Sequence, residues 1–143
     1  MPIRIVAITA KTPILDRRLL ETELRKAVRD QQASGVRLMA WYPAQPANST
    51  YRRTGNLKRS WHAPPVQVQG GVMVGEIASQ GQIAPYNRKV QGGDGEQDPF
   101  FAGRGWRNVD RLEALVRKDF GGRVQAALDR AAAKQGQQGR LDL

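Results

Sequence analysis

The chain has 143 residues, of which 40% are hydrophobic and 25% are charged, and this length suits one domain with a modest core. It contains no cysteine and a single histidine, His62, which excludes disulfides, thiolate metal sites and sites built from several histidines. The formal net charge is +10, and residues 1–63 hold 12 basic and 4 acidic groups, whereas residues 64–143 hold 11 and 9. This basic excess in the first half favours an anionic partner, either nucleic acid or an acidic protein surface.

The N-terminus carries a short run of β-branched residues at positions 3–9. The run predicts a strand, and an N-terminal arm over residues 1–12 is the alternative interpretation. It is too short for a signal sequence or a membrane span, and Arg4 interrupts it. We therefore expect a soluble protein that is not exported and has no membrane partner.

Thr12 and Pro13 predict the start of an amphipathic helix, because threonine caps helices and proline fits the first helical position. Apolar residues then recur at intervals of three and four until Ser34-Gly35, where we expect the helix to end. We expect the opposite face to be solvated and to carry salt bridges. Its charged residues are Arg17, Arg18, Glu21, Glu23, Arg25, Lys26, Arg29 and Asp30.

Residues 41–53 are predicted to form a loop, since Pro43 and Pro46 prevent regular structure there. Thr54 can cap a short helix that ends before Pro64-Pro65.

Cations and aromatic residues are interleaved around this short helix, with no acid among them. Such a cluster is typical of a nucleic-acid surface, and an ordinary exposed basic turn explains it equally well. The residues that would contact DNA or a partner are Arg52, Arg53, Lys58, Arg59 and Trp61.

Valines alternate with other residues on both sides of Gly70-Gly71, with Met73 among the intervening positions. This period of two predicts a β-hairpin over residues 66–78 with a two-residue turn. Residues 79–105 are rich in turn formers and predict a long loop, which in a compact domain is usually functional or mobile.

Asn108 is a good N-cap, and the apolar residues that follow keep helical spacing for about six turns. Gly121-Gly122 in the middle of this helix predicts either a bend or close packing against another backbone. Residues 134–143 are polar and contain glycine, so we expect a flexible, frayed tail.

No constellation in the sequence predicts catalysis or ion binding. His62 has no activated nucleophile near it in the sequence. Asp94, Glu96 and Asp98 have the alternating spacing of a calcium loop, but Pro99 stands where that loop needs glycine. We expect no catalytic residue, no metal site, no cofactor-binding site and no cofactor.

Several short motifs follow one another in a fixed order over residues 50–132. They are Thr54-Gly55-Asn56-Leu57-Lys58-Arg59-Ser60, the glycine-split hairpin, the segment from Tyr86 to Gly92, Pro99-Phe100 and the closing amphipathic helix. In this order they resemble the tail-component family (tail-completion or neck, head-tail junction) of long-tailed bacteriophages, whose motif is Thr-Gly-x-Leu-basic-basic-Ser. The matching residues are Thr54, Gly55, Leu57, Ser60, Tyr86, Gly92, Pro99 and Phe100.

The motif itself is typical of a structural part. Thr54 would cap the helix, Gly55 would permit a tight entry, and Leu57 would pack inward. Lys58, Arg59 and Ser60 would then face outward. The chain departs from the family pattern at two places, Arg88-Lys89 and Arg104-Gly105-Trp106.

The resemblance implies a single α+β domain over residues 1–143, in which an N-terminal helix and a long C-terminal helix pack on a small antiparallel sheet with long loops. It also implies a structural virion protein rather than an enzyme, made in the host cytoplasm and built into a ring that joins the head connector to the tail. Its partners would be other copies of the chain, head-tail connector and tail proteins, and non-specifically the packaged DNA. A free, small, basic nucleic-acid-binding protein that uses the cluster at residues 52–59 is the alternative.

Overall fold

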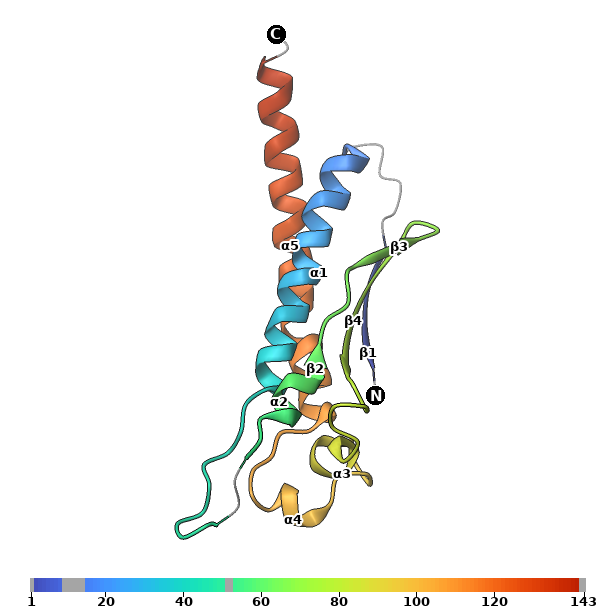
Figure 1. Cartoon of the computed structure of the whole chain (residues 1–143). Helices are drawn as coiled ribbons and strands as arrows, with labels where there is room; N and C mark the ends of the chain where they lie inside the picture. The colour runs from blue at the N-terminus through green and yellow to red at the C-terminus, as the bar shows by residue number, and fades with distance from the viewer. Residues whose placement is uncertain (1, 9–14, 51–52, 142–143) are drawn as a thin grey trace.

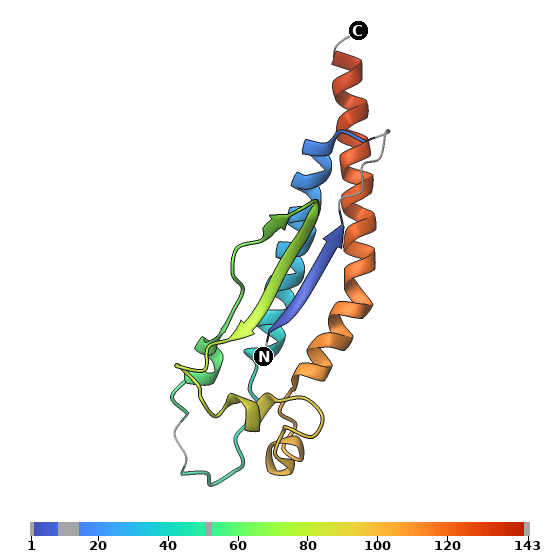
Figure 2. The ribbon, with the colours of Figure 1, turned by 90° about the vertical axis from the view of Figure 1, so that its right-hand side faces the viewer.

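The fold is α+β, as expected, in a computed structural model that describes residues 2–8, 15–50 and 53–141 (Figure 1). The two long helices lie on the same face of a four-stranded antiparallel sheet (Figures 1 and 2). The strands are β1 (Ile3–Ile8), β2 (Trp61–His62), β3 (Gln67–Gln69) and β4 (Val72–Ser79). The helices are α1 (Arg17–Met39), α2 (Asn56–Ser60), α3 (Asn87–Gln91), α4 (Pro99–Ala102) and α5 (Val109–Leu141).

Strand β4 is the centre of the sheet. β1 pairs along one side of it, with Ile5 opposite Gly75, and the shorter β3 and β2 pair along the other side. The strand predicted near the N-terminus is therefore confirmed and lies at an edge of the sheet. Residues 1 and 9–12 of the alternative arm lie outside the described residues.

The predicted hairpin is confirmed as β3 and β4, joined by Gly70 and Gly71. Both glycines have positive φ values, 59° and 82°, which is the requirement of a type I′ turn. The face of β4 that packs on the helices carries Met73 and Ile77, each 0% exposed, whereas Val72 and Val74 lie on its other face. The pairing with β1 sets this choice, because it places buried Ala7 opposite Met73.

Helix α1 begins at Arg17, where the carboxylate of Asp16 accepts hydrogen bonds from the backbone N–H groups of Arg18 (2.9 Å) and Leu19 (3.1 Å). The predicted cap, Thr12 with Pro13, lies outside the described residues. One charged residue differs from expectation, because Glu23 is only 3% exposed although it was placed on the solvated face.

The predicted end of this helix at Gly35 is wrong, because α1 continues to Met39. A Cβ atom on Gly35 would collide with the Cδ1 atom of Ile77 on β4 and lie 2.9 Å from the Cδ1 atom of Leu112 on α5. On the facing strand, a Cβ on Gly75 would collide with Val28 of α1. These two glycines therefore allow α1 to lie directly against β4, which is why glycine occurs inside the helix.

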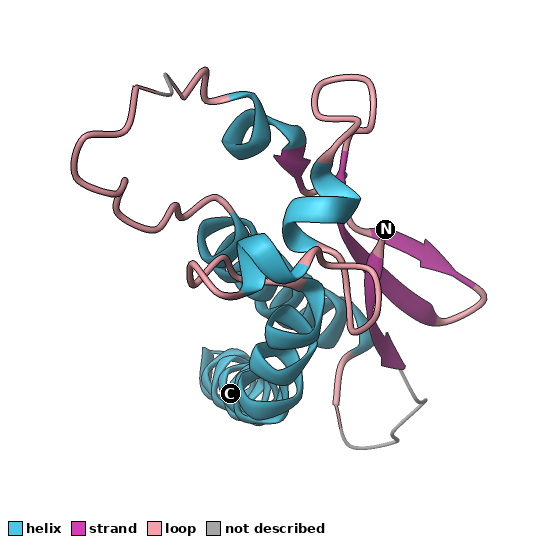
Figure 3. Ribbon diagram, turned by 90° about the horizontal axis from the view of Figure 1, so that it is seen from below, coloured by secondary structure: helices cyan, strands magenta, loops and turns pink. Residues whose placement is uncertain are grey.

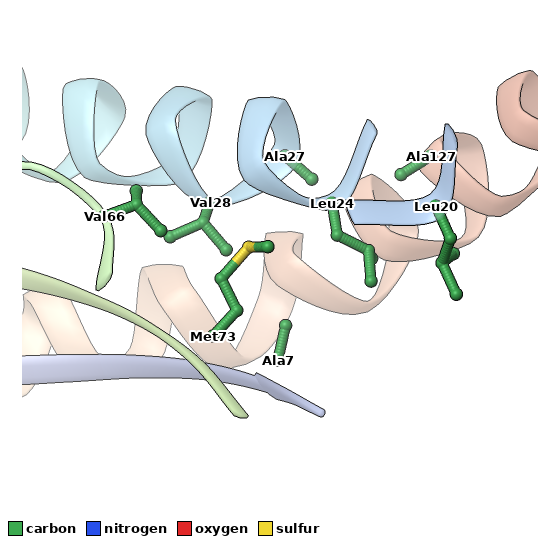
Figure 4. Packing of buried hydrophobic residues seen from close by; sticks show 8 residues of the cluster. All are labelled: Ala7, Leu20, Leu24, Ala27, Val28, Val66, Met73 and Ala127. Carbon is green, nitrogen blue, oxygen red and sulfur yellow. The ribbon is translucent and has the colours of Figure 1, made fainter. Parts of the chain in front are cut away.

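The core lies between the sheet and the two long helices (Figure 4). Met73 of β4 and Ala7 of β1 face Leu24 and Val28 of α1, and Ala127 brings α5 into the same cluster (Figure 4). A second cluster continues toward the start of α5, where Leu112 is 0% exposed.

Helix α5 starts as predicted, because Asn108 Oδ1 accepts a hydrogen bond of 3.1 Å from the backbone N–H of Arg111. The helix is continuous through Gly121 and Gly122, and a Cβ atom on either would meet no heavy atom within 4 Å. The predicted close packing at these glycines is therefore wrong. The predicted flexible tail from residue 134 is also wrong as far as Leu141, since α5 continues to that residue and Lys134 pairs with Glu23 of α1.

The segment at residues 79–105 is more regular than predicted, because it contains α3 and α4. Gln97 joins its parts: its side-chain amide donates to the carbonyl oxygens of Val90 (2.8 Å) and Trp106 (3.0 Å). The prediction of a loop at residues 41–53 is confirmed for the residues that are described. No helix in the described part of the chain is long and apolar enough to cross a membrane.

Candidate functional site

An open cavity of about 460 Å³ lies at the end of the molecule where α2, α3 and α4 gather. Figure 3 looks onto this end, with the loop that follows α1 on one side and α4 near the middle. Five of the eight residues that carry the family resemblance line the cavity: Thr54, Gly55, Leu57, Tyr86 and Phe100. Because they come from three separate segments, the fold brings the motif residues together around one space.

The floor of the cavity is a small apolar cluster separate from the main core. Leu57 (3% exposed) packs with Val90 (4%), and Tyr42, Phe101 and Trp106 pack against them. The Tyr42 and Trp106 rings lie 5.2 Å apart between centroids, and Phe101 meets Trp106 edge-on at 6.2 Å. The aromatic residues therefore connect the loop after α1 to the segment after α4.

Arg53 occupies one wall. Its guanidinium carbon lies 5.4 Å from the ring centroids of both Tyr42 and Trp106, and one of its terminal nitrogens donates to the Pro43 carbonyl at 2.6 Å. Arg53 is therefore a partly buried part of the cavity rather than a freely exposed contact.

Arg104 and Phe100 form the rim. The Arg104 guanidinium carbon lies 3.5 Å from the Phe100 ring centroid, and Phe100 is 56% exposed. Tyr86, which also lines the cavity, is 41% exposed. Among the described residues no aspartate or glutamate lines the cavity, so its charged lining consists of two arginines.

Helix α2 differs from the prediction in its cap. Gly55, with a φ of 78°, occupies the N-cap position, and no side chain caps the helix. Thr54, the residue before the N-cap, accepts at its Oγ1 atom a long hydrogen bond of 3.4 Å from the backbone N–H of Asn56. The positive φ explains the glycine of the motif, since other residues rarely adopt that conformation.

The outward face predicted for this helix is correct for Lys58 and Arg59, which are exposed, and wrong for Ser60, which is 0% exposed. The Ser60 hydroxyl donates to the Leu57 carbonyl at 2.6 Å and lies 3.1 Å from the hydroxyl of Ser79. The motif serine therefore anchors α2 to the end of β4.

Trp61 was predicted as a surface contact, but it is 4% exposed. Its indole N–H donates to the side-chain oxygen of Gln91 at 2.7 Å, and the Gln91 amide donates to the Met39 carbonyl at 2.9 Å. This buried polar link joins β2, α3 and the end of α1, so Trp61 helps to hold α3, which carries the cavity-lining Val90. Arg52, the remaining predicted contact, lies outside the described residues.

The other two motif residues shape the backbone. Gly92 ends α3, and a Cβ there would collide with the carbonyl oxygen of Arg88. Pro99 stands in the first turn of α4, directly after Asp98, whose carboxylate caps that helix by accepting from the Phe100 N–H at 2.9 Å.

The chain matches no protein-family model, no curated protein and no solved structure. Within the described residues, no three His, Asp or Glu side chains are grouped so that they could hold a metal ion. His62, the first candidate for catalysis, has its Nδ1 atom 3.3 Å from the Ser60 carbonyl oxygen. What the site can offer chemically is an apolar recess with a cationic rim.

A second basic surface lies on α1. An open groove on this helix is lined by Arg18, Arg25, Lys26 and Arg29, together with Glu21 and Asp30. Glu21 pairs with Arg17 at 2.9 Å, and Arg25 donates to the Val66 carbonyl at 3.0 Å. This face is the mixed, solvated surface that the sequence predicted.

Proposed function

We propose that this chain is a structural subunit of a bacteriophage virion at the head-tail junction, of the tail-completion or neck type, and that it assembles as a ring. The observation that carries the proposal is the convergence of five motif residues on one open cavity at one end of the molecule. The three remaining motif residues, Ser60, Gly92 and Pro99, fix the helices that form its walls.

An apolar recess with exposed aromatic residues at its rim suits docking to another protein. Phe100 and Tyr86 are among the most exposed large hydrophobic residues of the described chain, and both belong to this end. Aromatic residues and arginines are enriched where protein interfaces concentrate their binding energy. A ring subunit also needs two different surfaces for its neighbours, and the loops at residues 41–53 and 79–105 are the segments we propose for docking.

Labelling of purified virions tests this proposal. The particles are those of the phage that encodes the chain, and the probe is an antibody against the chain, viewed by negative-stain microscopy. We expect label at the head-tail junction, and we expect particles made without the chain to contain unjoined heads and tails. Joined particles that form without the chain and bind no antibody would overturn the proposal.

A free nucleic-acid-binding protein is the second candidate, supported by the exposed Lys58 and Arg59, which have no acidic partner among the described residues. Its test is the salt dependence of binding to a short DNA duplex. If both cations contact phosphates, the double variant Lys58→Ala/Arg59→Ala lowers the slope of log affinity against log salt by about 2.

The matched control is Arg17→Ala/Arg117→Ala, which removes two exposed cations that pair with glutamates of their own helices. An equal change of slope in both double variants, or no binding at low salt, would argue against the cluster at residues 52–59 as a nucleic-acid site.

A further inference from the structure

We infer that the cavity binds a segment of another virion protein in which carboxylate side chains flank one bulky apolar side chain. The inference rests on the proposed function and gives the chemistry of the neighbour that this end recognises. It follows from three properties of the cavity: its apolar floor, its unbalanced positive charge and the way its aromatic rings are already occupied.

The apolar floor of the cavity favours a ligand with an apolar anchor side chain. Leu57 and Val90 close the bottom, and the cavity volume of about 460 Å³ lies within the usual range of pockets that bury a ligand, about 300–1,000 Å³. An aromatic or large aliphatic side chain that entered would exchange water for contact with Leu57 and the surrounding rings. Such a buried anchor is the usual centre of a protein interface.

The positively charged walls of the cavity favour a ligand with carboxylate side chains. Arg53 and Arg104 line the cavity, and neither forms an ion pair with a described acidic residue. Among the described residues only the Pro43 carbonyl accepts from the Arg53 guanidinium, so most of its five N–H donors are left for a ligand. Two rings hold this guanidinium in place, so a carboxylate would meet a donor group that is already oriented.

The surface beside the cavity is also positively charged. Lys58 and Arg59 are exposed on α2 beside the cavity-lining Leu57, so carboxylates on both sides of the anchor would find a cation. An acidic segment with one anchor therefore matches both the floor and the rim.

The aromatic rings favour a peptide over a nucleic acid. A base needs an open ring face on which to stack. Arg53 lies over Tyr42 and Trp106, those two rings contact each other, and Arg104 lies over Phe100. The rings of the cavity are therefore mostly occupied by groups of the protein itself.

Selection of random twelve-residue peptides on the full-length protein tests this inference. We expect the enriched sequences to share one aromatic or large aliphatic residue with acidic residues on both sides. Fluorescence anisotropy of a labelled, enriched peptide then gives its affinity for the wild-type chain and for variants.

Arg104→Glu should weaken this peptide about tenfold or more, because it places a like charge on the rim. Lys118→Glu is the matched control, since Lys118 is exposed on α5, which contributes no residue to the lining of the cavity, and it should change the affinity by less than about twofold. In the peptide, replacing the anchor by alanine or the acids by their amides should each cost about tenfold.

Three results would overturn the inference: no enriched sequence or one without acids, equal effects of the two variants, and displacement of the peptide by a dT oligonucleotide. Self-association of the wild-type chain that saturating peptide abolishes would assign the cavity to a second copy instead of another protein. If the virion labelling fails and the peptide experiment succeeds, the proposed function is wrong and the binding site stands. If the labelling succeeds and the peptide experiment fails, the proposed function stands and the inference about the binding site is wrong.

Discussion

Glu23 and Arg130 form an ion pair that ties α1 to α5, with 2.7 Å between Glu23 Oε2 and Arg130 Nε. The other carboxylate oxygen accepts from the ammonium of Lys134, so one buried acid holds two cations of the last helix. The hydrogen bond from Arg130, followed by that from Lys134, lowers the pKa of Glu23 from its ordinary 4.5 to about 2.

This pair predicts a loss of stability in acid. Because the pKa of Glu23 is lower in the folded chain than in the unfolded chain, the folded chain binds fewer protons, and the stabilisation is complete above pH 4.5. It is lost as the pH falls toward 2. Urea unfolding should show Glu23→Gln to be less stable by roughly 2 kcal/mol above pH 4.5, with a difference that shrinks toward pH 2.

Glu113→Gln is the control for this prediction. Glu113 pairs with Arg117 on the surface of α5, where its side chain is 52% exposed, so its replacement should change the free energy of unfolding by less than about 0.5 kcal/mol. If Glu23→Gln cost no more than Glu113→Gln, the buried pair would not stabilise the contact between the helices.

Two glycines inside helices should respond to alanine with opposite signs. Gly121→Ala should stabilise the protein by about 0.5–1 kcal/mol, because alanine is the better helix former and the position is open. Gly35→Ala should destabilise it by roughly 1–3 kcal/mol, because its methyl group would press on Ile77 and Leu112, both fully buried. Thermal unfolding of the two variants measures both signs, and stabilisation by Gly35→Ala would show that α1 and β4 do not approach closely.

The same glycine shows what local sequence can predict about the fold. A run of β-branched residues identified β1, and the periods of two and of three to four identified the hairpin and both long helices, because each of these signals depends on neighbouring residues. Gly35 was interpreted as a helix end because Ser34-Gly35 is a local stop signal. Its actual role depends on Ile77 and Leu112, which are distant in the sequence, and no local pattern contains that information.

The candidate site was predictable only in part, for a related reason. The sequence shows the motif at residues 54–60 and the aromatic residues. It does not show that Tyr42 packs against Trp106, because these positions are 64 residues apart. Trp61 was placed on the surface because its neighbours in the sequence are polar and basic. Its hydrogen bond to Gln91 depends on the packing of α3, which the sequence did not predict as a helix.

This buried hydrogen bond makes Trp61→Phe a costly change. Phenylalanine fills most of the same space but has no N–H donor, which leaves the side-chain oxygen of Gln91 (0% exposed) without its partner. A loss of roughly 1–3 kcal/mol in the free energy of unfolding is expected. Trp41→Phe, the same substitution at a residue that is 42% exposed and stacks under Arg107, should cost less than about 1 kcal/mol. Equal losses would mean that ring size rather than the hydrogen bond matters.

The last helix should tolerate a short truncation and not a longer one. Figures 1 and 2 show α5 extending past the start of α1, and the N–H of Asp16, the N-cap of α1, donates a hydrogen bond to the side-chain oxygen of Gln135 on α5 (2.7 Å). A chain that ends at Gln138 keeps a turn beyond Lys134, so its stability in urea should stay within about 0.5 kcal/mol of the full chain. A chain that ends at Asp129 loses both partners of buried Glu23 and should be destabilised by about 3–5 kcal/mol, as expected when a buried ion pair loses one side. Similar stability of the two truncated chains would contradict the assignment of the junction between α1 and α5 to Glu23, Arg130 and Lys134.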